Sequence, residues 1–270
     1  MTTARPILFS TSMIRALLDG RKSMTRRIVK QQERLRMGTD VLIEGDHRPE
    51  YPNEYGSWQQ WVPNAKTMRC PYGVPGDLLW VRETFLPDPP SDHSSWEDEG
   101  IATYVSWSGC GGALGDIPQA LRTPSHVLYR ATWKTEHKWQ WRPSIHMPRK
   151  FSRLTLELTD VRVERLQDME GQHPSESDAI AEGVNKIHHG DGAYYYSAFR
   201  NEPHPKNWCD PTDAFRELWE KLNGNGSWDL NPWVWVLSFK VHHANVDAVL
   251  AQRAEVADAM IAEGSKDGAG

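Results

Sequence analysis

The order in which strand-like and helix-like segments follow one another is the feature of this sequence that most restricts its fold. A short apolar run at residues 6–10 precedes a helical pattern that ends at Gly20. Most later apolar segments have the composition and alternation of strands, and they cover residues 24–29, 78–85, 127–133, 152–163 and 233–239. Two short helices are expected over residues 174–183 and 211–222. Because helices do not alternate regularly with strands, we expect an α+β fold rather than a doubly wound α/β fold.

The strands must bury one face without leaving long exposed edges. A small β-barrel with flanking helices meets this requirement. Polar, turn-rich segments interrupt the pattern, and we interpret them as long loop insertions at about residues 30–66, 87–125 and 184–210. The sequence therefore predicts a single domain over residues 1–243. Residues 244–270 are expected to form an Ala-rich helix and a disordered tail.

Charge and composition exclude several classes of protein. The formal net charge of the 270 residues is −5, so contact with nucleic acid would have to come from a local basic patch. Three cysteines are too few for a disulfide framework. The sequence shows neither an apolar leader nor an apolar run of about 18 residues. We therefore expect a cytoplasmic protein with no membrane partner.

Residues 20–27 have an unusually high density of side chains that can take part in binding or catalysis. They include four cations, two hydroxyl groups and a glycine. If a strand begins at residue 24, Thr25 and Arg27 share one of its faces and Arg26 lies on the other. Lys22 precedes this strand. In a regular strand Lys22 and Thr25 would face opposite ways, so their cooperation requires a turn before the strand, which the glycine favours.

This stretch resembles a known signature. Gly20, Lys22, Thr25 and Arg27, following a short helix, are similar to the signature of the ASCH domain, a relative of the PUA barrels. Three later segments resemble further parts of that domain in the same order, and these are residues 75–83, 179–183 and 233–236. The chain as a whole resembles long ASCH-containing proteins of phages and prophages. The resemblance covers most of the chain outside the insertions and the tail, and it implies a PUA-like barrel with a cleft beside the first helix.

The resemblance also implies a reaction. The best-defined activity in the family is amide hydrolysis of N4-acetylcytidine, which uses a lysine and a threonine three residues apart and a glutamate from a later helix. Lys22 and Thr25 match the first two positions, and Glu182 aligns with the third. Many family members carry glutamate where this chain has Thr25, so the threonine favours the hydrolase branch. Other relatives are thought to bind RNA, and one is reported as a ribonuclease.

These residue types suit amide hydrolysis on chemical grounds. A threonine hydroxyl becomes nucleophilic only when a base takes its proton. Lys22 can be that base only if burial or neighbouring cations lower its pKa towards neutrality, and Arg21, Arg26 and Arg27 are such cations. Glu182 could then hold the lysine in place or shuttle a proton. The structural alternative is a solvated Lys22 and a Thr25 that is only a strand residue.

Several residues are candidates for contact with substrate or nucleic acid, namely Arg26, Arg27, Trp80, Arg82, Glu83, His146 and Arg149. The arginines could bind phosphates or base edges. Their alternative role is a salt bridge on the barrel, with Glu83 as the obvious partner. Trp80 could stack on a base or belong to the core. His146 and Arg149 lie in a proline-flanked loop, which is either the rim of a cleft or ordinary surface.

No metal or other cofactor is expected. The histidines and the cysteine between residues 188 and 209, and the histidines at 242–243, lack zinc-finger spacing. We therefore predict a metal-free amidohydrolase that removes an acyl group from the N4 amine of a (deoxy)cytidine-type substrate. The expected partner is a nucleoside, or RNA or DNA bearing a modified pyrimidine. The alternatives are a non-catalytic module that reads a modified base, a ribonuclease, and a phage assembly protein. A phage-encoded chain would act in the bacterial host cytoplasm.

Overall fold

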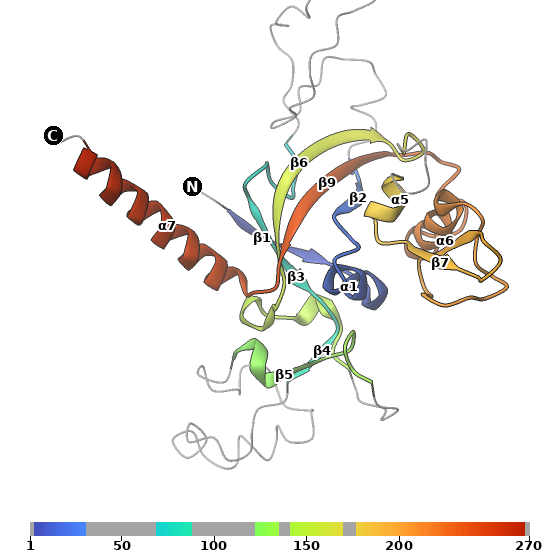
Figure 1. Ribbon diagram of the computed structural model, residues 1–270, viewed down its shortest axis with the longest axis horizontal. Coiled ribbons are helices and arrows are strands. Elements are labelled where there is room, and N and C mark those ends of the chain that lie inside the picture. Colours follow the sequence, from blue (N-terminus) through green and yellow to red (C-terminus); the bar gives the residue numbers. More distant parts are fainter. Residues whose placement is uncertain (1–2, 31–68, 88–121, 135–140, 170–176, 268–270) are drawn as a thin grey trace, which may run out of the picture. The chain divides into compact units, whose positions relative to one another are not determined.

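The computed structural model describes residues 3–30, 69–87, 122–134, 141–169 and 177–267 of the chain (Figure 1). Its helices are α1 (Thr11–Leu18), α5 (Asp178–Ala181), α6 (Pro211–Asn223) and α7 (Val246–Asp267). Short 3-10 helices lie at Pro124–His126, Ser144–His146 and Arg149–Phe151. No helix among the described residues is both long enough and apolar enough to cross a membrane.

One five-stranded sheet organises the chain. Its strands are, in spatial order, β1 (Ala4–Leu8), β3 (Leu78–Arg82), β6 (Thr155–Arg165), β9 (Trp233–His242) and β2 (Met24–Ile28). β1 pairs with β3 in parallel, and β2 pairs with β9 antiparallel. In Figure 1 the neighbouring strands β6 and β9 are long curved arrows. The α+β class is therefore confirmed. Within the described residues the sheet order ends at β1 and at β2, so the strands do not close into the expected barrel.

Two strand pairs lie outside this sheet. β4 (Phe85–Pro87) pairs with β5 (Val127–Tyr129). β7 (Asn185–His188) pairs with β8 (Tyr194–Ser197) and forms a hairpin within the third predicted insertion. Glycines with positive φ in the five-residue connection, Gly190 and Gly192, allow the tight return. The other two insertions fall almost entirely outside the described residues.

The chain divides into two compact units. The first unit comprises residues 1–3, 16–77 and 157–241, and the second comprises residues 4–15, 78–156 and 242–270. Each unit is described by itself below. The prediction of a single domain over residues 1–243 remains a prediction.

The first unit is built around strands β2, β6 and β9 and helix α6. β6 contributes buried Leu158, Val161 and Val163, and its apolar residues change face near residue 160. This change of face leaves room for a polar row on the strand. α6 begins at an Asp210 cap, whose carboxylate accepts the N–H of Thr212, and it buries Phe215, Leu218 and Trp219.

The second unit has its own apolar core. Leu78 and Trp80 pack with Val246 and Val249 of α7. The Asn245 side chain just before α7 donates hydrogen bonds to the carbonyl oxygens of Arg149 and Ser152 at 2.9 and 2.7 Å. The start of α7 is therefore fixed to the segment that precedes β6.

Candidate functional site

The position of Lys22 follows from the way α1 ends. Gly20 adopts a φ of +70°, which a glycine accommodates at a helix C-terminus. The carbonyl oxygen of Ala16 then accepts two N–H groups, from Arg21 at 2.9 Å and from Lys22 at 3.1 Å. Lys22 therefore lies in a turn before β2, as the sequence predicts, and not in a regular strand.

The Lys22 side chain is fully buried and paired with Glu182. Its Nζ atom donates hydrogen bonds to the Glu182 carbonyl oxygen at 2.6 Å and to Glu182 Oε2 at 2.7 Å. Burial lowers the pKa of Lys22 below its ordinary value; the negative charge of Glu182 acts against this shift, and the cations of Arg27 and Arg26 add to it. Lys22 is thus a desolvated amine whose proton is easier to remove than that of a surface lysine.

Glu182 is held by the end of α5. Ser177 caps this helix by accepting the N–H of Ala179 at 3.2 Å, and Glu182 follows its last residue. Gly183 comes next, with a φ of +99°. A Cβ atom at this position would lie 2.8 Å from the Ala16 Cβ and 3.3 Å from the Lys22 Cβ. Only glycine permits this close approach, which brings Glu182 to Lys22.

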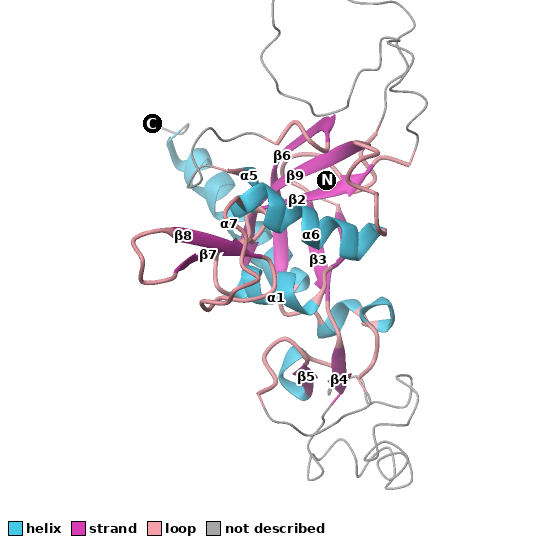
Figure 2. Cartoon of the chain, turned by 90° about the vertical axis from the view of Figure 1, so that its right-hand side faces the viewer, coloured by secondary structure: helices cyan, strands magenta, loops and turns pink. Residues whose placement is uncertain are grey.

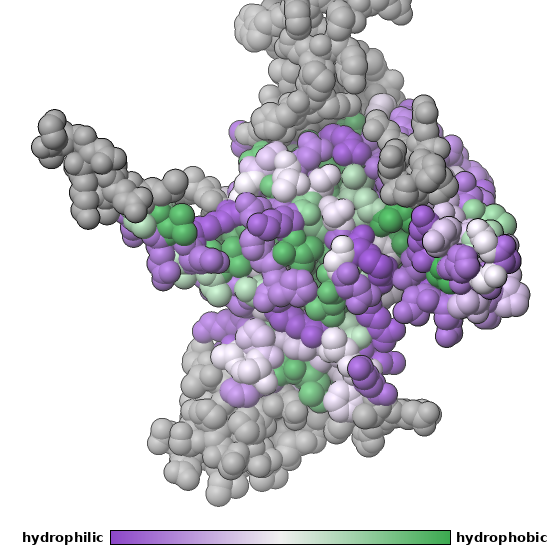
Figure 3. All heavy atoms as spheres, in the orientation of Figure 1, coloured by the Kyte–Doolittle hydropathy of each residue, from purple (hydrophilic) through white to green (hydrophobic). Residues whose placement is uncertain are grey.

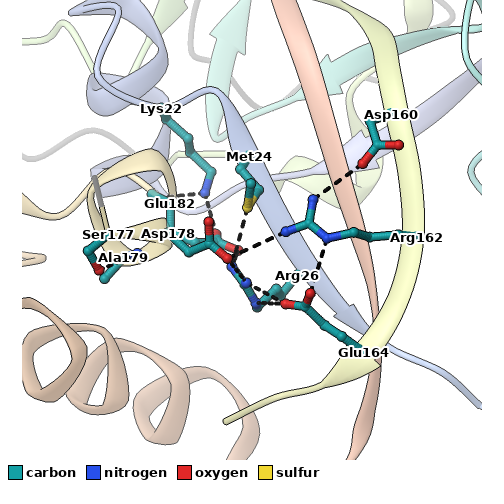
Figure 4. Close-up of polar contacts among 10 residues, drawn as sticks. All are labelled: Lys22, Met24, Arg26, Asp160, Arg162, Glu164, Ser177, Asp178, Ala179 and Glu182. Carbon is teal, nitrogen blue, oxygen red and sulfur yellow. Dashed lines mark hydrogen bonds and ion pairs between the residues drawn. The ribbon is translucent and has the colours of Figure 1, made fainter. Parts of the chain in front are cut away.

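A network of charges surrounds the pair (Figure 4). The Arg26 guanidinium contacts three carboxylates: Glu182 Oε1 at 3.4 Å, Glu164 Oε1 at 3.1 Å from Nε, and Asp178. Arg162 binds the same Glu164 at 3.1 Å and the same Asp178 at 3.4 Å. Each arginine therefore shares two carboxylates with the other, and Glu182 joins this network to Lys22.

Electrostatics differ between the two neighbouring arginines of β2. Burial alone would lower the pKa of Arg26, but the charges of Glu182, Glu164 and Asp178 outweigh it and raise that pKa. Burial lowers the pKa of Arg27, against the effects of Tyr72 and Glu182. Arg26 is therefore a fixed cation of the network rather than a free contact for phosphate.

Thr25 occupies a different place from the pair. It is buried on β2 opposite Leu237 of β9. Strand alternation puts Thr25 on the face opposite Arg26, and Arg26 is the neighbour that contacts Glu182. The hydrogen bonds of the Lys22 Nζ atom described above go to Glu182. The structure thus brings together two of the three residues predicted to be catalytic, and the role of Thr25 stays a prediction.

The remaining predicted contact residues belong to the second unit. Trp80 is buried in its core, as in the structural alternative for that residue. Arg82 donates from Nε to the Met147 carbonyl oxygen at 3.0 Å, and its guanidinium lies 5.0 Å from the centre of the Trp80 ring. Both residues therefore have structural partners within their own unit.

Glu83 forms a salt bridge, but with a partner that the sequence did not suggest. Arg153 binds it with two parallel hydrogen bonds, Nε to Oε1 at 2.9 Å and Nη2 to Oε2 at 3.0 Å. The Arg153 guanidinium also lies 3.9 Å from the centre of the Tyr129 ring. The structural alternative of a salt bridge is therefore found for Glu83, and its partner within the second unit is Arg153.

The last two candidates lie on the surface. His146 is exposed at the end of a 3-10 helix. Arg149 forms a salt bridge with Asp247 at 2.6 Å, and both side chains are substantially exposed. Their interpretation as the rim of a cleft stays a prediction.

Sequence reasoning missed Asp160, Arg162, Glu164 and Asp178. Three of them stand at alternate positions of β6, which places them on one face of the strand. The alternation of charged residues with buried valines was the signal that could have revealed this polar row. Within the described ranges, no group of three His, Cys, Asp or Glu side chains is arranged to hold a metal ion.

Comparisons of the chain with protein-family models, with curated proteins and with solved structures find no match. The geometry of the network and the resemblance of the sequence signature are therefore what a functional proposal can use.

Proposed function

We propose that this chain is an ASCH-type, PUA-like protein, and that its first unit hydrolyses an amide on a nucleobase. The proposed reaction is the metal-free removal of an acyl group from the N4 amine of a cytidine-type substrate. The observation that supports it most is the buried ion pair of Lys22 with Glu182, at 2.7 Å between residues 160 positions apart. A lysine serves as a base when its surroundings lower its pKa, and burial does so here.

In the proposed mechanism, neutral Lys22 takes the proton of the Thr25 hydroxyl. The Thr25 oxygen attacks the acyl carbon, the C–N4 bond breaks, and the lysine proton passes to the leaving amine. Water then hydrolyses the threonine ester with Lys22 again as base, which restores the hydroxyl and releases the carboxylic acid. Glu182 is a positioning residue that holds Nζ and balances its charge when it is protonated. The role of Thr25 in this mechanism rests on the sequence resemblance alone.

A second function has its own support. The side chains of Lys22 and Glu182 are 0% and 1% exposed, and three carboxylates hold Arg26. Such a closed network also suits a rigid framework that presents a base-binding surface without performing chemistry. A non-catalytic module that reads a modified base is therefore the second candidate.

Incubation with N4-acetylcytidine, followed by chromatography of the products, tests the first proposal. We expect deacetylation by the wild-type protein and a loss of roughly 10² to 10⁴ in rate for Lys22→Met, the range for a positioned base. Thr25→Val tests the nucleophile, and Glu182→Gln tests the positioning residue.

Arg153→Met is the matched control, because it removes a partly buried cation from a glutamate pair of the second unit. It should leave the rate unchanged, and circular dichroism should show that each variant is folded. Absence of turnover by the wild-type protein, or full turnover by Lys22→Met, would contradict the hydrolase. Binding of the acetylated nucleoside without conversion would instead support the binding module.

A further inference from the structure

A second candidate site lies on the β7–β8 hairpin of the first unit (Figure 2). His188 lies opposite Tyr194, and Lys186 lies opposite Tyr196. A further bridge joins Tyr196 to Trp208. Because directly opposed residues of an antiparallel ladder share a face, these five side chains belong to one face, which we call the hairpin face.

The hairpin face exposes two large aromatic rings. Tyr194 is 51% exposed and Trp208 is 41% exposed, whereas Tyr196 between them is buried. Lys186 and His188 are exposed beside them. In Figure 3 residues of intermediate hydropathy, the class that includes Tyr and Trp, lie among hydrophilic ones over α6 and β7. Two exposed aromatic rings on one strand face form a candidate surface for stacking a planar ligand.

Neighbouring groups hold both rings in place. The Trp208 indole Nε1 donates a hydrogen bond to Glu217 Oε2 of α6 at 2.8 Å. The Tyr194 ring lies 5.3 Å from the His188 ring, and the Lys186 Nζ atom lies 4.3 Å from its centre. Rings that are already oriented lose little conformational entropy when a planar ligand stacks on them.

The five side chains of the hairpin face include one ammonium group and no carboxylate. Lys186 lies against Tyr194, and exposed Lys206 precedes Trp208 by two residues. Three carboxylates lie beside this face: Glu217 holds the Trp208 indole, Asp191 accepts the Tyr195 hydroxyl at 3.1 Å, and Asp210 lies near Tyr196. Tyr195 belongs to the opposite face of the hairpin, since it pairs with Ile187.

We propose that the hairpin face binds single-stranded nucleic acid. Successive bases stack on the rings of Tyr194 and Trp208, and Lys186 contacts the backbone phosphates. Stacking tolerates any base, so the site would bind a strand with little sequence preference. This inference stands independently of the proposed amide hydrolysis. A neutral oligosaccharide could also stack on the rings, but it carries no negative charge to pair with the Lys186 ammonium group beside Tyr194.

Fluorescence anisotropy with labelled DNA and RNA oligonucleotides of about 12 nucleotides, within the usual site sizes, tests the proposal. We expect binding that weakens between about 50 and 200 mM salt, because phosphate contacts release counterions. Tyr194→Ala and Trp208→Ala should each weaken binding about tenfold. Lys186→Gln should reduce the slope of affinity against salt.

Matched variants separate the hairpin face from general effects. Tyr195→Ala changes the same residue type on the opposite face and should leave the affinity unchanged. Tyr194→Phe keeps the ring and should bind like wild type, so it shows that the alanine variant loses binding through the ring and not through the hydroxyl group. Tyr194→Ala and Trp208→Ala should also deacetylate free nucleoside at the wild-type rate, so failure of this site is distinguishable from failure of the amide hydrolysis.

Three results would overturn the proposal. The first is the absence of oligonucleotide binding by the wild-type chain. The second is binding that both alanine variants retain in full. The third is binding of a neutral oligosaccharide in place of the oligonucleotide, which would assign the hairpin face to carbohydrate.

Discussion

Each unit of this protein buries a glutamate against a cation, and the two pairs differ in the kind of cation. In the first unit Glu182 holds Lys22 at 2.7 Å and also contacts Arg26. In the second unit Glu83 receives two parallel hydrogen bonds from Arg153, which is stacked on Tyr129. Both glutamates are about 2% exposed.

The cation decides what each pair can do. An arginine keeps its proton in proteins, so only the carboxyl group can titrate in the pair of Glu83 and Arg153. A buried lysine can lose its proton, so the pair of Glu182 and Lys22 has two accessible protonation states. Burial shifts the titrating group of each pair towards its neutral form: it lowers the pKa of Lys22 and raises that of Glu83.

The two pairs should differ most in how much stability the protein loses when the carboxylate of each pair is removed. Glu182→Gln leaves a fully buried cation without its counter-charge, so we expect a loss of roughly 3–5 kcal/mol in the free energy of unfolding. Glu83→Gln should cost less, roughly 1–3 kcal/mol, because Arg153 is partly exposed and can be solvated. Urea denaturation of both variants measures the difference. Equal losses would show that the two pairs are energetically alike.

The backbone next to Glu182 should be the next most sensitive feature. Gly183→Ala places a methyl group 2.8 Å from the Ala16 Cβ and forces a side chain into a φ of +99°. We expect a loss of about 2–3 kcal/mol from strain and overpacking. Gly190→Ala is the control, since its φ is +89° but no atom lies within 4 Å of the new methyl group. Thermal unfolding of the two variants should differ, and identical midpoints would remove the packing role of Gly183.

Titration of Lys22 should make the stability of the protein depend on pH below the ordinary lysine pKa of 10.5. Its folded pKa is lowered from an ordinary value of 10.5, so between these two values the unfolded chain binds more protons. Stability should therefore rise as the pH increases through this window and be level above it. Lys22→Met should lose this rise. An unchanged slope in Lys22→Met would mean that another group produces it.

Titration of Glu83 should give a slope of stability against pH that has the opposite sign, at pH values above 4.5. Its folded pKa is raised from an ordinary value of 4.5, so the folded state binds more protons just above that pH. The contribution of Glu83 to stability should fall as the pH increases from 4.5 through the folded pKa. Comparison of wild type with Glu83→Gln by denaturation at several pH values isolates this slope, and a rise in the same window would contradict it.

The smallest effect should come from the exposed pair of Arg149 and Asp247. Their side chains are 36% and 57% exposed, so water and salt screen the attraction. Arg149→Ala should change the free energy of unfolding by less than about 1 kcal/mol. A larger loss in a denaturation experiment would show that Arg149 has a packing role that exposure does not reveal.

Local features of the chain were predictable from the sequence. The end of α1 at Gly20 and the start of α6 at Pro211 depend on neighbouring residues only. The turn that contains Lys22 also depends on neighbouring residues only. The approach of Glu182 to Lys22 was anticipated by the sequence resemblance, because no local pattern links residues 160 positions apart.

Long-range pairing was not predictable in the same way. Each charged residue of β6 is compatible with solvent exposure when it is considered alone, so the network with Arg26 did not emerge. The partner of Glu83 was missed for the same reason, since Arg153 lies 70 residues away. The β7–β8 hairpin lies in a segment that was interpreted as a loop insertion, and β8 packs against α6, a contact that the local sequence does not encode.

Ala16 is a tightly packed position of the first unit. Its carbonyl oxygen accepts the N–H groups of Arg21 and Lys22, and its methyl group limits how closely Gly183 can approach. One small side chain on α1 thus controls the spacing of the lysine and the glutamate. In a selection for function among random codons at this position, we expect glycine, alanine and serine to survive and every larger residue to be eliminated.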